Sequence, residues 1–166
     1  MGKEYNNGYL VKKIPLTLED KNNFSENLML FFTGISRNSF EIQSGTQKNL
    51  KTNIDKLKEM NELVDTAYGY LTLKQFDEIG KLLDYTWKLK RGLNNSISNN
   101  TIDEIYTVAK SVGALGGKLL GAGGGGFMLF YIKKENQDKL RGALKNLLEI
   151  PFKFDDEGSK IIYRTI

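Results

Sequence analysis

Three stretches of apolar residues along the chain predict strands. Residues 28–33 and 127–132 are almost continuously apolar, which is typical of buried strands. Tyr9–Leu16 alternates more weakly between apolar and polar positions, and it carries Pro15 near its end. Because proline has no backbone N–H to donate to a central ladder, this third stretch predicts a short strand at the edge of a sheet.

A second group of residues shows the period of amphipathic helices. Apolar residues recur at spacings of three and four over residues 46–90, and Gly69 suggests a break between two helices there. Thr101 and Glu104 have the spacing of a capping box, so they predict the start of a third helix. Gly113 is expected to end that helix.

The C-terminal end predicts one more helix and a hairpin. Residues 137–148 have helical periodicity, residues 152–154 alternate, and residues 160–166 follow an acidic turn and predict a final strand. Helices that are grouped between strands favour an α+β fold. We therefore expect a single domain over residues 1–166, with a ferredoxin-like, mainly antiparallel sheet of about four strands packed against helices.

Composition restricts the chemistry that the chain can perform. Its 166 residues include neither cysteine nor histidine, which excludes disulfides, thiolate metal sites and every mechanism with a histidine base. The formal net charge of +4 suits phosphate-bearing partners, but an ordinary solvated surface explains it equally well. No apolar run reaches the length of about 18 residues that a membrane span needs, and the N-terminus lacks the apolar core of a signal peptide. We expect a cytoplasmic protein without a membrane partner.

The least ordinary segment is residues 121–126, which contains only glycine and alanine. Ordering such a run costs conformational entropy, so the folded state must gain something from it. Either successive N–H groups form an anion-binding concavity, or another backbone or a ligand approaches very closely. A flexible linker and a tight turn without a ligand are the alternatives. The run is neither a P-loop nor a dinucleotide-binding fingerprint, because no Gly-Lys-Ser/Thr follows and the next element is a strand.

The residues around this run resemble the third conserved motif of the GHMP kinases, the family of galacto-, homoserine, mevalonate and phosphomevalonate kinases. The match consists of Lys118–Gly126, Ser98-Asn99, Ile102-Asp103 and the helix end at Gly113-Ala114. Within the family, Phe32–Arg37 and Trp87–Arg91 look most like the bacterial D-glycero-D-manno-heptose 7-phosphate kinase branch. The similarity covers essentially the whole chain, as a C-terminal domain only.

The resemblance implies a two-domain parent enzyme with its active site between the domains. In the family, the N-terminal domain supplies a Pro-x-x-x-Gly-Leu-Gly-Ser-Ser-Ala loop around the ATP phosphates, together with an acidic residue and the Mg²⁺ ligands. Neither Pro15 nor Pro151 begins such a loop. We therefore expect the N-terminal nucleotide-binding domain to be absent and to be the partner of this chain. We also expect ATP and Mg²⁺ in the complete enzyme, and neither bound tightly by this chain alone.

The implied reaction is ATP-dependent phosphorylation of a sugar phosphate, with this half shaping the acceptor pocket and supporting the phosphate loop. No catalytic residue and no metal ligand is expected in this chain. Two groups of residues are candidates for binding. Contact with the substrate or the phosphate loop is expected from Lys118, Gly121, Gly123, Gly124, Gly125 and Gly126. Binding of the acceptor is expected from Ser36, Arg37, Lys88, Lys90 and Arg91.

The cations among these candidates have two interpretations. An arginine that follows a buried strand suits bidentate contact with a phosphate. Lysine and arginine at the end of a helix are also expected from the helix dipole alone. Trp87, the only tryptophan of the chain, is expected in the core or at a domain interface.

Other functions stay open at this point. A non-catalytic remnant or a regulatory module would keep the same fold without the nucleotide-binding half. Another GHMP kinase, similar to galactokinase or mevalonate kinase, would act on a different acceptor. An RNA-recognition motif fits poorly, because Gly124–Phe127 supplies neither the leading cation nor the first aromatic residue of its signature. No nucleic-acid partner is therefore expected.

Overall fold

The computed structural model describes residues 3–5, 9–35, 49, 51–155 and 161–163. The candidates Ser36 and Arg37 and most of the predicted final strand lie outside these residues. The elements are, in chain order, β1 (Lys3–Tyr5), β2 (Tyr9–Val11), α1 (Leu18–Ser25), β3 (Leu28–Phe32), α3 (Ile54–Thr72), α4 (Phe76–Arg91), α5 (Asn100–Ser111), β4 (Gly116–Leu119), β5 (Phe127–Tyr131), α6 (Lys134–Ala143) and β6 (Leu148–Glu149).

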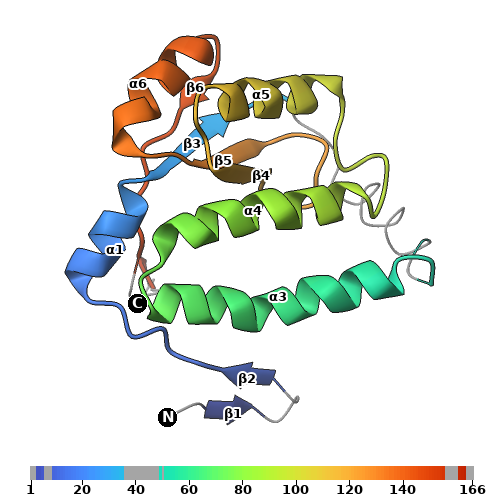
Figure 1. The fold of residues 1–166 in the computed structure, drawn as a ribbon, viewed down its shortest axis with the longest axis vertical. Coiled ribbons are helices and arrows are strands. Elements are labelled where there is room, and N and C mark those ends of the chain that lie inside the picture. Colours follow the sequence, from blue (N-terminus) through green and yellow to red (C-terminus); the bar gives the residue numbers. More distant parts are fainter. Residues whose placement is uncertain (1–2, 6–8, 36–48, 50, 156–160, 164–166) are drawn as a thin grey trace.

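The main sheet has four antiparallel strands in the order β4-β5-β3-β6. In Figure 1, α4 lies between this sheet and α3, whereas α5 and α6 lie on the side of the sheet away from α3. The predicted α+β class with a four-stranded antiparallel sheet is therefore confirmed. Within the described ranges, no helix combines the length and the apolar character needed to cross a membrane.

The core forms where β3 and β5 pair. Side chains alternate between the two faces of a sheet, so every second residue of each strand faces the core. Met29 and Phe31 of β3 are buried, and so are Met128 and Phe130 of β5. In the ladder Met29 lies opposite Phe130, and Phe31 lies opposite Met128. The helices close the core with Trp87, Ile102, Ile105, Tyr106, Ala109, Leu140 and Leu144. The strands predicted at 28–33 and 127–132 are confirmed, and Trp87 is fully buried.

The prediction for the N-terminal end is only partly correct. The strand expected over Tyr9–Leu16 is only β2, which pairs with β1 in a separate two-stranded sheet. The sequence interpretation also missed α1, whose capping box consists of Thr17 and Asp20. The backbone N–H of Asp20 donates to Thr17 Oγ1 at 3.1 Å, and Thr17 N donates back to Asp20 Oδ2 at 2.9 Å. The helix has too few apolar residues to show a periodic pattern.

The helix boundaries also differ from the prediction. Helix α3 runs through Gly69 without a break and ends at Thr72. The cap of α5 is Asn99 rather than Thr101, because its side chain accepts from Ile102 N. The helix expected over residues 137–148 is α6, which ends at Ala143.

The fourth strand of the sheet lies before the predicted hairpin. It is β6, which pairs with β3 through Leu148 and Glu149. Residues 152–154 and 161–163 have no regular secondary structure. The short β6 is therefore the strand that completes the sheet beside β3.

Candidate functional site

The glycine run forms the turn between β4 and β5. Leu120 N donates to Phe127 O at 2.8 Å and closes the hairpin at the base of the loop. Gly121, Gly123, Gly124 and Gly126 all have positive φ angles, between 74° and 127°. Residues with a side chain are strained in this backbone region, so the local geometry requires glycine at these four positions.

One flank of the loop is held by the segment that leads into α5. Gly124 N donates to Ile97 O at 2.8 Å. The side chain of Asn99 donates through Nδ2 to Gly124 O at 3.2 Å, while its Oδ1 caps α5. An added Cβ at Gly123 would lie 2.8 Å from Ile97 Cα, which is closer than real contacts allow. This flank therefore needs glycine for close approach as well as for conformation.

The other flank is held by the segment that follows β3. Thr33 N and Thr33 Oγ1 donate to Gly126 O at 2.8 and 2.9 Å. Gly126 N donates to Ile35 O at 2.8 Å, and a Cβ on Gly125 would lie 2.4 Å from that same oxygen. The loop is thus clamped between two backbones. This is the close approach that the glycine content predicted as one of two explanations, and it is the opposite of a free linker.

A network of polar contacts braces the segment that precedes α5. Arg91 Nη1 donates to Asp103 Oδ1 at 2.7 Å, and Ser98 Oγ donates to the same oxygen at 2.7 Å. The Arg91 guanidinium also lies over the rings of Trp87 and Tyr106, at 5.8 and 6.0 Å from their centroids. The end of α4 is therefore tied to the residues that hold the loop.

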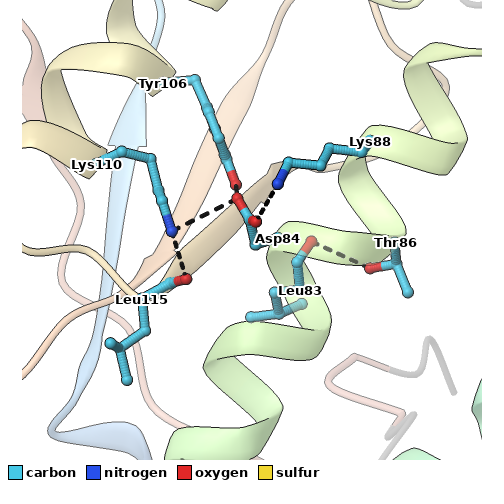
Figure 2. A network of polar contacts seen from close by, with 7 residues as sticks. All are labelled: Leu83, Asp84, Thr86, Lys88, Tyr106, Lys110 and Leu115. Atoms are coloured by element: carbon cyan, nitrogen blue, oxygen red, sulfur yellow. Dashed lines mark hydrogen bonds and ion pairs between the residues drawn. The ribbon is translucent and has the colours of Figure 1, made fainter.

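A second network joins α4, α5 and Leu115, the residue before β4, around the carboxylate of Asp84 (Figure 2). Tyr106 Oη donates to Asp84 Oδ1 at 2.5 Å, and Lys88 Nζ donates to Oδ2 at 2.7 Å. Lys110 Nζ lies 3.5 Å from Oδ1 and donates to Leu115 O at 2.7 Å. Burial would raise the pKa of Asp84, but these hydrogen bonds and the two ammonium charges together lower it. Burial, assisted by the hydrogen bond to Asp84, raises the pKa of Tyr106.

Helix α4 and strand β4 touch through their backbones beside this network. A Cβ on Gly116 would lie 2.0 Å from Gly80 O and 2.6 Å from Asp84 N. Glycine at position 116 is therefore required for the helix to lie against the strand. Strand β4 was not predicted, because its sequence Gly-Gly-Lys-Leu contains no typical strand former. The need for glycine at position 116 is one reason for this sequence.

The candidate cations of α4 have different surroundings. Lys88 pairs with Asp84, and Arg91 pairs with Asp103. Lys90 Nζ instead donates to the backbone oxygen of Gly121 at 2.6 Å, at the start of the loop. Burial, followed by the charge of nearby Lys118, lowers the pKa of Lys90. Lys90 and Lys118 are thus the candidates that the structure brings together beside the glycines.

Sequence reasoning did not select the residues that hold the loop. Asn99 belongs to the family motif, and a Ser-Asn pair before a helix is a recognisable capping signal, but neither feature predicts its contact with the loop. Ile35 and Ile97 act through their carbonyl oxygens, so their side chains give no signal at all. In the described ranges, no three acidic side chains gather as a metal site would require.

The structure also contains a hollow away from the loop. It has a volume of ≈ 700 Å³ and is lined by Lys12, Ile14 and residues of α3 that include Val64, Asp65, Tyr68 and Leu71. Its lining is mostly apolar, and Lys12 Nζ lies 3.8 Å from Asp65 Oδ1. None of the predicted site residues that the structure describes borders it. The glycine loop remains the stronger candidate, because it contains the predicted glycines and is held in one position by close contacts on both flanks.

Comparison with known proteins points to one family. The profile described as "GHMP kinases C terminal" matches residues 67–150, about half of the chain. The D-glycero-alpha-D-manno-heptose 7-phosphate kinase of Campylobacter jejuni is 28% identical over 136 residues, which are 80% of this chain and 40% of that protein.

Two solved structures share the fold. The mevalonate kinase of Methanococcus jannaschii superposes with a TM-score of 0.66 at 23% identity, over 87% of this chain and 44% of that one. A D-glycero-D-manno-heptose 1-phosphate kinase from Bacteroides thetaiotaomicron gives a TM-score of 0.61 at 20% identity, over 95% and 43% of the two chains. The chain therefore spans less than half the length of these relatives. With its fold, its glycine loop and the matched residues, it belongs to the GHMP kinase family, as a C-terminal domain of that family.

Proposed function

We propose that this chain is the C-terminal half of an ATP-dependent sugar kinase. This half shapes the acceptor pocket and supports the phosphate loop of an N-terminal half. The observation that supports this most is the clamped glycine loop. Gly123 and Gly125 lie against Ile97 and Ile35, so the loop keeps one shape. A Cβ on Gly121 or Gly126 would meet no atom within 4 Å. The loop therefore offers a fixed, side-chain-free surface to a second backbone or a ligand.

The acceptor that we propose is a sugar phosphate, with D-glycero-D-manno-heptose 7-phosphate as the first candidate. The similarity to the Campylobacter jejuni heptose 7-phosphate kinase supports this choice. The cations near the loop suit an anionic acceptor. ATP and Mg²⁺ would be held mainly by the N-terminal half, where they supply the phosphoryl group and neutralise its charge. The role of this chain would be to orient the acceptor and to exclude water.

Another GHMP kinase activity is the second candidate. The mevalonate kinase of Thermococcus onnurineus is 26% identical over 145 residues. Mevalonate carries a carboxylate rather than a phosphate, and it would meet the same cations. The two acceptors can be separated by assay, but not by the fold.

The test supplies the chain with a matching N-terminal GHMP kinase half and measures ATP-dependent phosphorylation. The panel contains heptose 7-phosphate, unphosphorylated heptose, galactose and mevalonate. We expect transfer to heptose 7-phosphate by the pair, and no transfer by this chain alone. Preference for mevalonate or a neutral sugar would assign the chain to another branch. A folded pair that is inactive on the whole panel would favour a non-catalytic module.

A further inference from the structure

We propose that Lys90 and Lys118 together bind a phosphoryl group beside the start of the glycine loop, either that of a sugar phosphate or that of a nucleotide. The proposal deepens the proposed function, because it assigns a charge-bearing contact to two named residues. It commits to one chemistry, an oxyanion with several acceptor oxygens. Phosphate binding is measurable without phosphoryl transfer, so the two proposals can fail separately.

The geometry of α4 and β4 supports a shared site for the two lysines. Helix α4 and strand β4 run side by side, since Gly116 meets Gly80 and the amine of Lys90 meets Gly121 O. From residue 80 to residue 90 a helix rises about 15 Å, and from residue 116 to residue 121 an extended chain covers about 16 Å. The two elements therefore run in the same direction and cover similar lengths between these contacts. Lys118 is two residues after Gly116, so it lies on the face of β4 that looks toward α4.

The charges around the two lysines also favour an anion. Lys81 and Lys88 of α4 each form an ion pair within the helix, and Arg91 pairs with Asp103. Among the described residues, neither Lys90 nor Lys118 forms an ion pair with a carboxylate. Both are half-buried. After burial, the charge of Lys118 is the second cause that lowers the pKa of Lys90, so the two partly desolvated cations repel, and an anion bound to both removes that repulsion.

The amine of Lys90 has more hydrogen-bond donors than its bond to the loop uses. An ammonium group has three N–H donors and no acceptor. One donor of Lys90 is used on Gly121 O, and this bond fixes the amine beside the loop. The remaining donors can bind phosphate oxygens as charge-assisted hydrogen bonds. The lowered pKa of Lys90 agrees with a cation that lacks a counter-charge.

The test follows the lysine side-chain signals of the full chain by NMR during titration with inorganic phosphate at constant ionic strength. We expect saturable shifts of the Lys90 and Lys118 signals. Lys90→Gln and Lys118→Gln should each weaken binding by about tenfold, the loss of one charged hydrogen bond. Lys81→Gln is the matched control, since it removes the same charge from the same helix at an amine that pairs with Glu78. It should leave the affinity within about twofold.

Loss of the Lys90 amine also removes a bond to the loop, so Lys118→Gln carries the test if Lys90→Gln disturbs the glycine amide signals. The absence of saturable shifts in the unmodified chain would overturn the proposal. So would an equal loss of affinity in Lys81→Gln, or unchanged affinity in Lys118→Gln.

Parallel titrations identify the source of the phosphoryl group. Mannose 6-phosphate, ADP and unphosphorylated mannose serve as probes. Tighter binding of mannose 6-phosphate than of ADP supports an acceptor site, and the reverse order supports a nucleotide site. Binding of mannose as tight as that of mannose 6-phosphate would contradict a phosphoryl site. A chain that binds phosphate but yields an inactive pair would keep this inference and overturn the proposed kinase function.

Discussion

The side-chain amide of Asn99 donates a hydrogen bond to the carbonyl oxygen of Gly124 at 3.2 Å. The same side chain accepts from Ile102 N at 3.1 Å and so caps α5. One residue therefore fixes the start of a helix and one flank of the glycine loop. Changes at this position should separate into an effect on the helix and an effect on the loop.

Asn99→Ala removes both contacts and should lower the free energy of unfolding by about 1 kcal/mol or more, the usual cost of a lost cap. Asn99→Asp keeps an acceptor for the cap but loses the donor to Gly124. It should retain more stability, while hydrogen exchange at the loop amides becomes faster than in the unmodified chain. Urea unfolding and amide exchange measure the two effects. Equal exchange in Asn99→Asp and the unmodified chain would show that the contact does not hold the loop.

Substitution of Gly125 tests the close approach to the segment after β3. Gly125→Ala would place Cβ 2.4 Å from Ile35 O, so it should lower the free energy of unfolding by roughly 1–3 kcal/mol. Gly142 of α6 is the control, because a Cβ there meets no atom within 4 Å. Gly142→Ala should be neutral or stabilising by up to about 1 kcal/mol. Similar losses in the two variants would remove the steric argument.

In the assembled enzyme, Gly125→Val should abolish phosphoryl transfer. A β-branched side chain at this position blocks the close approach of the loop backbone to the backbone of Ile35. Circular dichroism of the variant must show that the fold is retained. Full activity of a folded Gly125→Val enzyme would mean that the loop is only a spacer. The measurement is the initial rate with heptose 7-phosphate and ATP.

Asp84→Asn tests the network of Figure 2. The change removes the negative charge that faces Lys88 and Lys110, while an amide oxygen can still accept from Tyr106. The carboxylate is only 16% exposed, so we expect a loss of about 1–2 kcal/mol of unfolding free energy. Glu78→Gln is the matched control, since its pair with Lys81 is exposed and should contribute less than about 0.5 kcal/mol. Equal effects of the two changes would contradict a structural role for the network.

Asp20 should make the free energy of unfolding of the chain depend on pH in the acidic range. The backbone N–H of Thr17, assisted by Lys74 and the Thr17 hydroxyl, lowers the pKa of Asp20 from 3.8 to about 2. A carboxyl group with a lowered pKa in the folded state stabilises the fold above its unfolded pKa. That contribution is lost as the pH falls from about 4 to about 2. An NMR titration should place the Asp20 midpoint near pH 2, and Lys74→Met should raise it. A midpoint near 4 in the unmodified chain would contradict this.

The sequence predicted those parts of the fold that depend on side-chain pattern. The continuous apolar runs of β3 and β5 identify the central strands, because one face of each strand is buried and most positions of the other face are partly covered. Strand β4 was missed because Gly116 is there to admit α4, and close approach leaves no hydrophobic pattern. Helix α1 was missed although Thr17 and Asp20 have the spacing of a cap, since no apolar stripe follows them.

The site was predictable to a similar extent. Its glycines stand out in the sequence, and they indicated either an anion-binding concavity or a close approach of another backbone or a ligand. The partners in that approach, Ile35 and Ile97, contribute carbonyl oxygens that any residue possesses. The distinction among Lys88, Lys90 and Arg91 was also hidden, because it depends on which carboxylates the fold brings near each amine or guanidinium.

The clamped loop has a consequence for the order in which the chain folds. Thr33 and Gly126 are 93 positions apart, and Gly124 must also meet Ile97, which belongs to a third region of the chain. Bringing distant segments together costs loop-closure entropy before any contact repays it. The helices α3, α4 and α5 can form from local contacts, but the glycine loop can take its shape only after β3, the α5 cap and the β4–β5 hairpin have met. The loop that we propose to shape the acceptor pocket is therefore expected to form among the last steps of folding.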